Sequence, residues 1–166
     1  MTIGQTTYSP DNEVAVPGMR ADNGPCDIVT MIAAEDIEAG RFVSIKSDGT
    51  VEKPKDDSEA IVGVALYGDM RMGSYPQGSP VIKAGDPFSV IRKGRVWVSY
   101  NATGTAAKLG TVHISNDNIT PVTADFGKAT GGAVVTNKVR DLASRAVYFK
   151  AAAATDTLAL VELNLP

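Results

Sequence analysis

Glycine and proline punctuate the whole chain and limit how long any regular element can be. The 166 residues include 16 glycines and 9 prolines, scattered rather than gathered in one segment. Between them lie short runs in which side chains alternate with a period of two, as in residues 41–45. Such alternation indicates β-strands, and frequent turn residues favour many short ones. We therefore predict a mostly β fold, a small β-barrel or β-sandwich.

Short apolar runs divide this fold into strands. Residues 61–67 are the most apolar run and are expected at the centre of the core. A hairpin is predicted over residues 89–101, with residues 92–95 as its turn and Trp97 on its second strand. At most one short helix is expected, near residues 137–145, where apolar residues have helical spacing. The other expected strands are 28–32, 41–45, 81–82, 109–114, 146–149 and 158–163.

Residues 1–26 differ in character from the rest of the chain. They are polar and interrupted by proline and glycine, yet they include Tyr8, Val14, Val16 and Met19. Proline stiffens the backbone and biases the residue before it toward an extended form. Two interpretations stay open: an arm that orders against a neighbour, or a disordered tail. The domain division is an extended N-terminal arm, 1–26, and a β-barrel domain, 27–166.

A second unusual segment is the loop insertion 68–79. It is long for a β-domain, in which hairpin loops usually need about two to five residues. It carries Met70, Met72 and Tyr75. Exposed methionine and aromatic side chains suit adaptable interfaces. The alternative is that these side chains fold back on the barrel.

The charge distribution argues against a nucleic-acid partner. The formal net charge is −3, and the densest cationic cluster is Arg92, Lys93 and Arg95. Nucleic-acid-binding domains usually carry a basic face or stripe, and this chain has only the one small cluster. The alternative to a binding role for this cluster is a hairpin tip whose charges are simply solvated. No run approaches the ~18 apolar residues of a membrane span, and the first residues lack the features of a secretory signal. We expect synthesis in the cytoplasm and no membrane partner.

Residues that could carry catalysis or bind a metal are sparse. His113 is the single histidine and Cys26 the single cysteine, which leaves no intrachain disulfide and nearly excludes a zinc site. His113 lies between Val112 and Ile114 in an expected strand, and a side chain that points outward into solvent explains this placement. Phosphate-binding and nucleophile-elbow motifs are absent from the sequence. No catalytic residue, metal or cofactor is predicted, while a pair of catalytic carboxylates stays open.

Several glycine and valine motifs follow one another from Ala39 onward. The central one is the IVGVA run at residues 61–65. The others are Ala39, Gly40, Val43, Gly49, Val51, Gly85, GRVWV at 94–98, LGTV at 109–112 and LVEL at 160–163. Their order resembles that of the structural cement (capsid decoration) proteins of tailed bacteriophages, over residues 28–114 and the last strand. Two segments depart from the family pattern: the loop 68–79 is longer, and the variable segment 116–145 has no counterpart.

The resemblance implies a non-enzymatic viral structural protein. Proteins of this family bind the outside of the mature phage head where shell subunits meet, and they often act as trimers. The expected partner is the major capsid protein, the expected assembly a homotrimer, and the expected location the capsid exterior of the virion. On this interpretation the protein cements adjacent capsid subunits against the pressure of packaged DNA.

Candidate contacts with the shell or a sister subunit come from the arm, the loop 68–79 and the hairpin. On the hairpin, Val96, Val98 and Tyr100 share one face while Trp97 and Ser99 share the other, and one face is expected to pack into the barrel. The hairpin's cationic residues would be rim charges. The candidates are Tyr8, Val14, Val16, Met19, Met70, Met72, Tyr75, Arg92, Lys93, Arg95 and Trp97.

Two other functions compete with this one. A carbohydrate-binding or host-recognition β-module on the virion would need exposed aromatic residues, and aromatic residues make up only 6% of the chain. A small β-barrel enzyme would need a deep pocket lined by perturbed acids.

Overall fold

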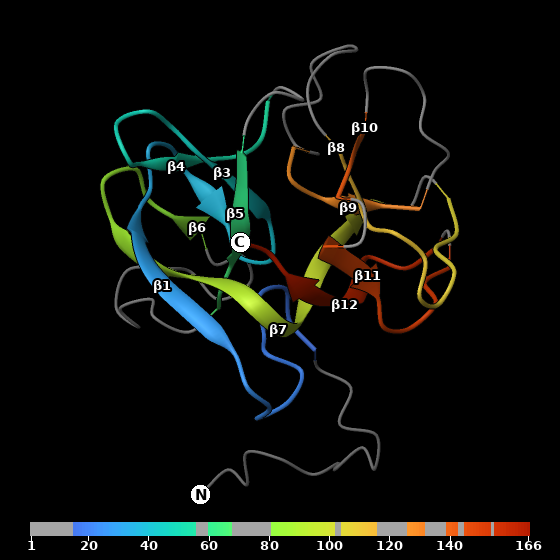
Figure 1. The fold of residues 1–166 in the computed structure, drawn as a ribbon. Helices are drawn as coiled ribbons and strands as arrows, with labels where there is room; N and C mark the ends of the chain where they lie inside the picture. Colours follow the sequence, from blue (N-terminus) through green and yellow to red (C-terminus); the bar gives the residue numbers. More distant parts are fainter. Residues whose placement is uncertain are drawn as a thin grey trace, which may run out of the picture.

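The computed structural model describes residues 15–55, 60–67, 81–101, 104–115, 126–131, 139–142, 145–153 and 155–166 (Figure 1). Within these ranges the chain forms strands and almost no helix, which confirms the predicted mostly β fold. The strands are β1 (Asp27–Ile32), β2 (Ile37–Glu38), β3 (Phe42–Ile45), β4 (Val51–Glu52), β5 (Ala60–Ala65), β6 (Val81–Ile82), β7 (Pro87–Asn101), β8 (His113–Ser115), β9 (Ala129–Thr130), β10 (Val139–Asp141), β11 (Ala146–Tyr148) and β12 (Leu158–Asn164).

Ten of these strands belong to one mixed sheet, and β2 and β6 form a small second one. The main path runs β10-β8-β9-β7-β5-β3-β4; β1 and β12 also pair with β7, and β11 pairs with β12. Figure 1 shows β1 to β6 on one side of the molecule and β8 to β12 on the other, with β7 crossing between them. Of the two expected architectures, the described strands form a sandwich-like sheet and do not close into a barrel.

Strand β7 runs through 15 residues without reversing direction. The predicted hairpin with a turn at residues 92–95 is therefore wrong. The first part of β7 pairs with β1 and β5, and the second part pairs with β12 and β9. One long strand thus supports both groups of strands.

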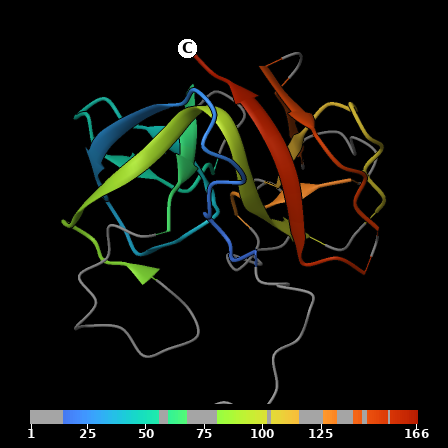
Figure 2. The ribbon, with the colours of Figure 1, turned by 90° about the horizontal axis from the view of Figure 1, so that it is seen from below.

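Gly94 explains why the sequence here imitates a turn. Its φ is 119°, a conformation that glycine adopts far more readily than other residues. A Cβ atom at this position would lie 3.2 Å from the Cβ atom of Cys26, because the segment that leads into β1 lies close beside β7 here. Figure 2 shows this dark-blue segment next to β7. A glycine with positive φ is typical of a hairpin turn, but here it allows another segment to approach a continuous strand closely.

The second part of β7 separates a core face from an outer face. Val96, Val98 and Tyr100 are buried, while Trp97 and Ser99 on the opposite face are half-buried. Strand β12 alternates in the same way beside it. The predicted division of side chains between the two faces is confirmed, although no hairpin carries it.

Strand β5 lies between β7 and β3, and its residues contribute to both clusters of buried side chains, although Tyr67 at the end of the predicted run is 50% exposed. Val64 and Ala65 are fully buried and pair in register with Ile91 and Val90 of β7. Gly63 permits this approach, because a Cβ atom there would lie 2.5 Å from the side chain of Val90.

A pair of buried tyrosines supports the other side of the sheet. Their rings, Tyr100 and Tyr148, meet edge to face with centroids 6.1 Å apart. The hydroxyl of Tyr148 donates to the carbonyl of Thr130 at 2.8 Å, which ties β11 to β9. Burial raises the pKa of Tyr148 far above its ordinary value, because the phenolate would lose its solvation.

The helix expected near residues 137–145 is wrong for residues 139–141. These form β10, which pairs antiparallel with β8 through Val139↔Ser115 and Asp141↔His113. Three apolar residues at helical spacing are too few to outweigh backbone pairing with a neighbouring strand. No helical segment with the length and hydropathy of a membrane span occurs in the part of the chain that the structure describes.

The described part of the predicted arm, residues 15–26, lies against β7 of its own chain. The N–H of Gly18 donates to the carbonyl of Trp97 at 2.7 Å, and the N–H of Trp97 donates to the carbonyl of Met19 at 2.9 Å. Arg20 forms a β-bridge with Val96. This stretch therefore extends the sheet beside β7 and is held by the chain's own backbone.

Candidate functional site

Backbone pairing brings two of the predicted contact residues together on the outer face. Trp97 exchanges hydrogen bonds with Gly18 and Met19, so its half-buried side chain lies beside the adjoining segment. Met19 is 43% exposed, and Val16 is half-buried nearby in sequence. Neither the arm nor the strand forms this arrangement alone.

Trp97 and Met19 line an open groove of about 680 Å³, which we call the outer groove. Leu158 and Leu160 of β12 also line it, together with several alanines, and both leucines are half-buried. Leu160 is the register partner of Trp97, which fixes the two side chains opposite each other on neighbouring strands. Charged residues lie at the groove as well: Lys150 and Asp156.

Arg95 lies on the same face but is engaged within the chain. Its Nε donates to Glu162 at 2.9 Å, and its Nη1 donates to Asp22 at 3.1 Å. The guanidinium also lies over the ring of Phe149, 4.0 Å from the centroid. The hydrogen bond to Glu162 raises the pKa of Arg95. This residue therefore fastens the segment containing Asp22 to β12 across β7.

The other two cations of the predicted cluster behave differently from each other. Nη1 of Arg92 lies 3.8 Å from the carboxylate of Asp27. Lys93 is exposed and has no ion pair with any residue in the described ranges. Two of the three expected rim charges thus have partners in their own chain.

Several predicted contact residues lie outside the described residues. They are Tyr8, Val14, Met70, Met72 and Tyr75. The sequence analysis in turn missed Leu158 and Leu160, which the structure places in the groove. Their signal is the alternation along residues 158–163, whose half-buried positions fall on the face of Trp97.

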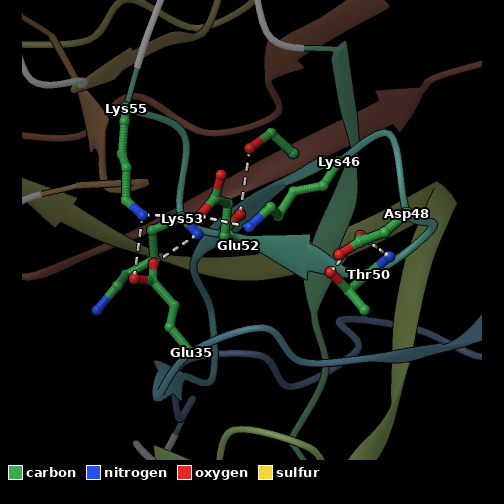
Figure 3. Close-up of polar contacts among 8 residues, drawn as sticks. Glu35, Lys46, Asp48, Thr50, Glu52, Lys53 and Lys55 are labelled. Atoms are coloured by element: carbon green, nitrogen blue, oxygen red, sulfur yellow. Dashed lines mark hydrogen bonds and ion pairs between the residues drawn. The ribbon is translucent and has the colours of Figure 1, made fainter.

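The carboxylates do not assemble into a recognisable catalytic centre within the described ranges. Glu52 accepts a hydrogen bond from Lys55 at 2.7 Å, and Glu35 lies 3.3 Å from the same ammonium (Figure 3). The hydrogen bond with Glu52 raises the pKa of Lys55. Among the described residues, no group of three His, Cys, Asp or Glu side chains could hold a metal ion. Half-buried His113 lies on β8, away from these residues in the sheet order.

Comparisons with known proteins agree with the fold. The model of a family described as structural cement protein (E217 gp24/Pam3 gp6) matches residues 4–164. A chain from the solved capsid of the Myoviridae phage XM1 has a similar structure, with a TM-score of 0.72 and 21% sequence identity over 98% of each chain. No curated protein matches. The family match covers nearly the whole sequence, so this chain belongs to the phage structural cement proteins and is a viral structural protein of the virion capsid.

Proposed function

We propose that the protein binds the outer surface of the assembled phage head and holds neighbouring major capsid protein subunits together against internal DNA pressure. It acts by binding alone, with no catalytic step and no cofactor, and it engages neither nucleic acid nor membrane. The observation that carries this proposal is the outer groove. Half-buried Trp97 and Leu160 and exposed Met19 lie over strands that are paired on both sides, which gives a rigid surface where apolar side chains stand among polar ones.

The mechanism is mass action. A protein that binds only the assembled shell stabilises it, by about 2.7 kcal/mol per site at 100 times the dissociation constant. Contacts repeated over a lattice add through effective concentration, so modest single-site affinities suffice. We propose a homotrimer as the bound unit, which would place three outer grooves on one shell position.

Other contacts extend the same proposal. The start of the arm, with Tyr8 and Val14, would continue from Ala15 at the outer groove and lie along the shell or a neighbouring copy. Met70, Met72 and Tyr75 would add a second contact. Lys93 is the cation of the predicted cluster that has no ion pair among the described residues and would meet an acidic shell surface.

The test is the copy number of this chain in purified particles of its source, measured by quantitative mass spectrometry against the major capsid protein. A lattice-wide cement gives a ratio near one copy per capsid subunit. A handful of copies per particle would contradict the proposal and indicate a vertex or fibre component, which is where a carbohydrate-binding or host-recognition module belongs. Absence from particles would contradict both.

A further inference from the structure

Strand β1 has one edge without a partner strand. Its other edge pairs with β7, through Val29↔Val90 and Met31↔Phe88. The N–H of Leu66 donates to the carbonyl of Ser89 at 2.9 Å, so the peptide groups of Ser89 point toward β5 rather than β1. Antiparallel strands alternate the direction of these groups. Those of Phe88 and Val90 therefore point toward β1.

The same alternation fixes which groups of β1 point outward. Val29 and Met31 bond to β7, and Ala33 continues the pattern by donating to the carbonyl of Asp86 at 3.1 Å. The peptide groups of Ile28, Thr30 and Ile32 consequently point away from the sheet. No strand pairs with them within the described part of the chain. At the next position of this series, the N–H of Ala34 donates to the carbonyl of Val51 at 2.7 Å, so this edge does form β-type bonds where a partner exists.

The side chains along this edge lack the usual protection against pairing. Ile28 is 38% exposed and Ile32 is 50% exposed, and Thr30 between them is also exposed. Natural edge strands are commonly protected by lysine, proline or inward charges. β1 contains neither lysine nor proline, and its one charged residue, Asp27, lies near Arg92 of its own chain. By contrast, Lys46, Lys53 and Lys55 flank the edge strand β4.

We propose that the partner of this edge is β1 of a second copy, paired antiparallel with Thr30 on the two-fold axis. This contact joins one copy to one other and is separate from the contacts within the proposed trimer. The exposed side chains are symmetric about Thr30, so Ile28 faces the partner's Ile32 and each Thr30 faces its counterpart. On the inner face, Val29 meets the partner's Met31. Because the outward peptide groups belong to residues 28, 30 and 32, each of these pairs exchanges both backbone hydrogen bonds. The only charged residue of β1 already has a partner of opposite sign, so the pairing brings no unbalanced like charges together.

Both ends of β1 fit this register. Ala34 already bonds to Val51, so a partner strand must end before this position. The register would bring the partner's Cys26 opposite Ala34. Cys26 lies beside Gly94 and just outside β1, which begins at Asp27. The paired segment is thus limited to residues 28–32 in each copy. This inference does not depend on binding to the head, and it concerns a face of the molecule other than the outer groove.

Disulfide trapping tests the two-fold pairing directly. Facing residues of a hydrogen-bonded antiparallel pair have Cα atoms about 5.5 Å apart, within the range of a disulfide. In a Cys26→Ser background, Thr30→Cys is expected to give a disulfide-linked pair on mild oxidation. Ser47→Cys, on an exposed turn, is the matched control and is expected to stay unlinked at the same protein concentration. If Thr30→Cys links no faster than Ser47→Cys, the two-fold pairing is wrong, including the case in which residues 1–14 or a shell segment occupy the edge.

The mass in solution gives a second, independent readout. Thr30→Lys adds a charge of the kind that protects natural edge strands, and it is expected to lower the molar mass from light scattering by half. Ser47→Lys adds the same charge elsewhere and is expected to leave the mass unchanged. Equal masses for wild type and Thr30→Lys would overturn the proposal. Failure of head binding with intact Thr30→Cys linkage would instead contradict the proposed function alone.

Discussion

The surface around β3 and β4 and the outer groove over β7 and β12 use their side chains in opposite ways. Around β4 the long polar side chains meet one another (Figure 3). Glu52 lies 2.7 Å from Lys55 and 4.0 Å from Lys46, and Glu38 lies 3.4 Å from Arg41. Around the outer groove, Trp97, Met19 and two leucines remain half-buried or exposed with no comparable cover.

This difference indicates where binding energy is available. Charges that already pair within the chain gain little from a partner, because they must first lose those contacts and their water. Half-exposed apolar side chains gain from every further part of their surface that a partner covers. The outer groove is therefore the stronger candidate for a shell contact, and the polar surface is the natural control.

The largest expected effect is that of Trp97→Ala on binding to heads. Removing a central aromatic anchor should weaken affinity about 30-fold, or about 2 kcal/mol, if Trp97 fills a pocket on the shell. Binding is measured by sedimentation with heads stripped of the protein. Lys53→Ala on the polar surface is the control, expected to bind as wild type. A Trp97→Ala protein that stays folded and binds heads normally would show that Trp97 only packs on its own sheet.

The next effect concerns the rigidity of the sheet beneath the groove. Tyr148→Phe removes the hydroxyl that donates to the carbonyl of Thr130 and so deletes this buried hydrogen bond. The expected loss is about 0.5–1.5 kcal/mol of unfolding free energy, measured by denaturant titration. Tyr100→Phe is the matched control. Its hydroxyl donates to the carbonyl of Gly104 at a less buried site, so the loss should be smaller. Equal losses of unfolding free energy in the two variants would show that the hydrogen bond between β11 and β9 contributes no more to stability than the less buried one.

Tyr148 also sets a dependence of stability on alkaline pH. Burial raises its pKa in the folded protein, whereas in the unfolded chain it titrates near its ordinary value of about 10. Above that pH the folded state holds a proton that the unfolded state has lost, so stability is complete below pH ~10 and falls as pH rises. Tyr148→Phe should show a shallower decrease, by up to about 1.4 kcal/mol per pH unit. If the unfolding free energies of wild type and Tyr148→Phe decreased equally steeply above pH ~10, the raised pKa of Tyr148 would be contradicted.

Arg95 offers a smaller and chemically specific test. Its planar guanidinium bonds to Glu162 and Asp22 and stacks on Phe149. Lysine retains the charge, but it has neither the planar set of N–H donors that bonds two carboxylates nor the flat surface that stacks on a ring. We expect Arg95→Lys to recover only part of the stability lost in Arg95→Ala, and both losses to be smaller than that of Tyr148→Phe. Full recovery by lysine in thermal unfolding would mean that charge alone matters at this position.

Local patterns account for the features that the sequence predicts well. The run 61–65 is short, apolar over its whole length and rich in β-branched residues, which favours a buried strand, and β5 lies there. The alternation of residues 96–100 likewise assigns the two faces of β7 without knowledge of the neighbours. In both cases the information sits within a few consecutive residues.

The errors occur where distant segments decide the local structure. No residue near Gly94 in the sequence indicates that residues 25–26 lie close against it, so this glycine is interpreted as part of a turn. Residues 139–141 become a strand because β8 offers a partner. The outer groove combines Met19, Trp97 and Leu160, which come from three separate parts of the sequence. The sequence identifies Met19 and Trp97 singly as candidate contacts, but it does not predict that they lie close together or that Leu160 lies beside them.

The smallest expected effect is that of Glu52→Gln on the polar surface. It removes the carboxylate that Lys55 and Lys46 share, and pairs with such exposed lysines are worth below about 1 kcal/mol. Most of that loss should disappear at 1 M salt, where the screening length is about 3 Å. Lys46→Ala, which removes only the longer contact, is the control for the shorter one. Head binding should not change in either variant. If Glu52→Gln weakened head binding as strongly as Trp97→Ala, the paired charges would belong to the shell contact, and in-chain pairing would not distinguish a passive surface from a binding one.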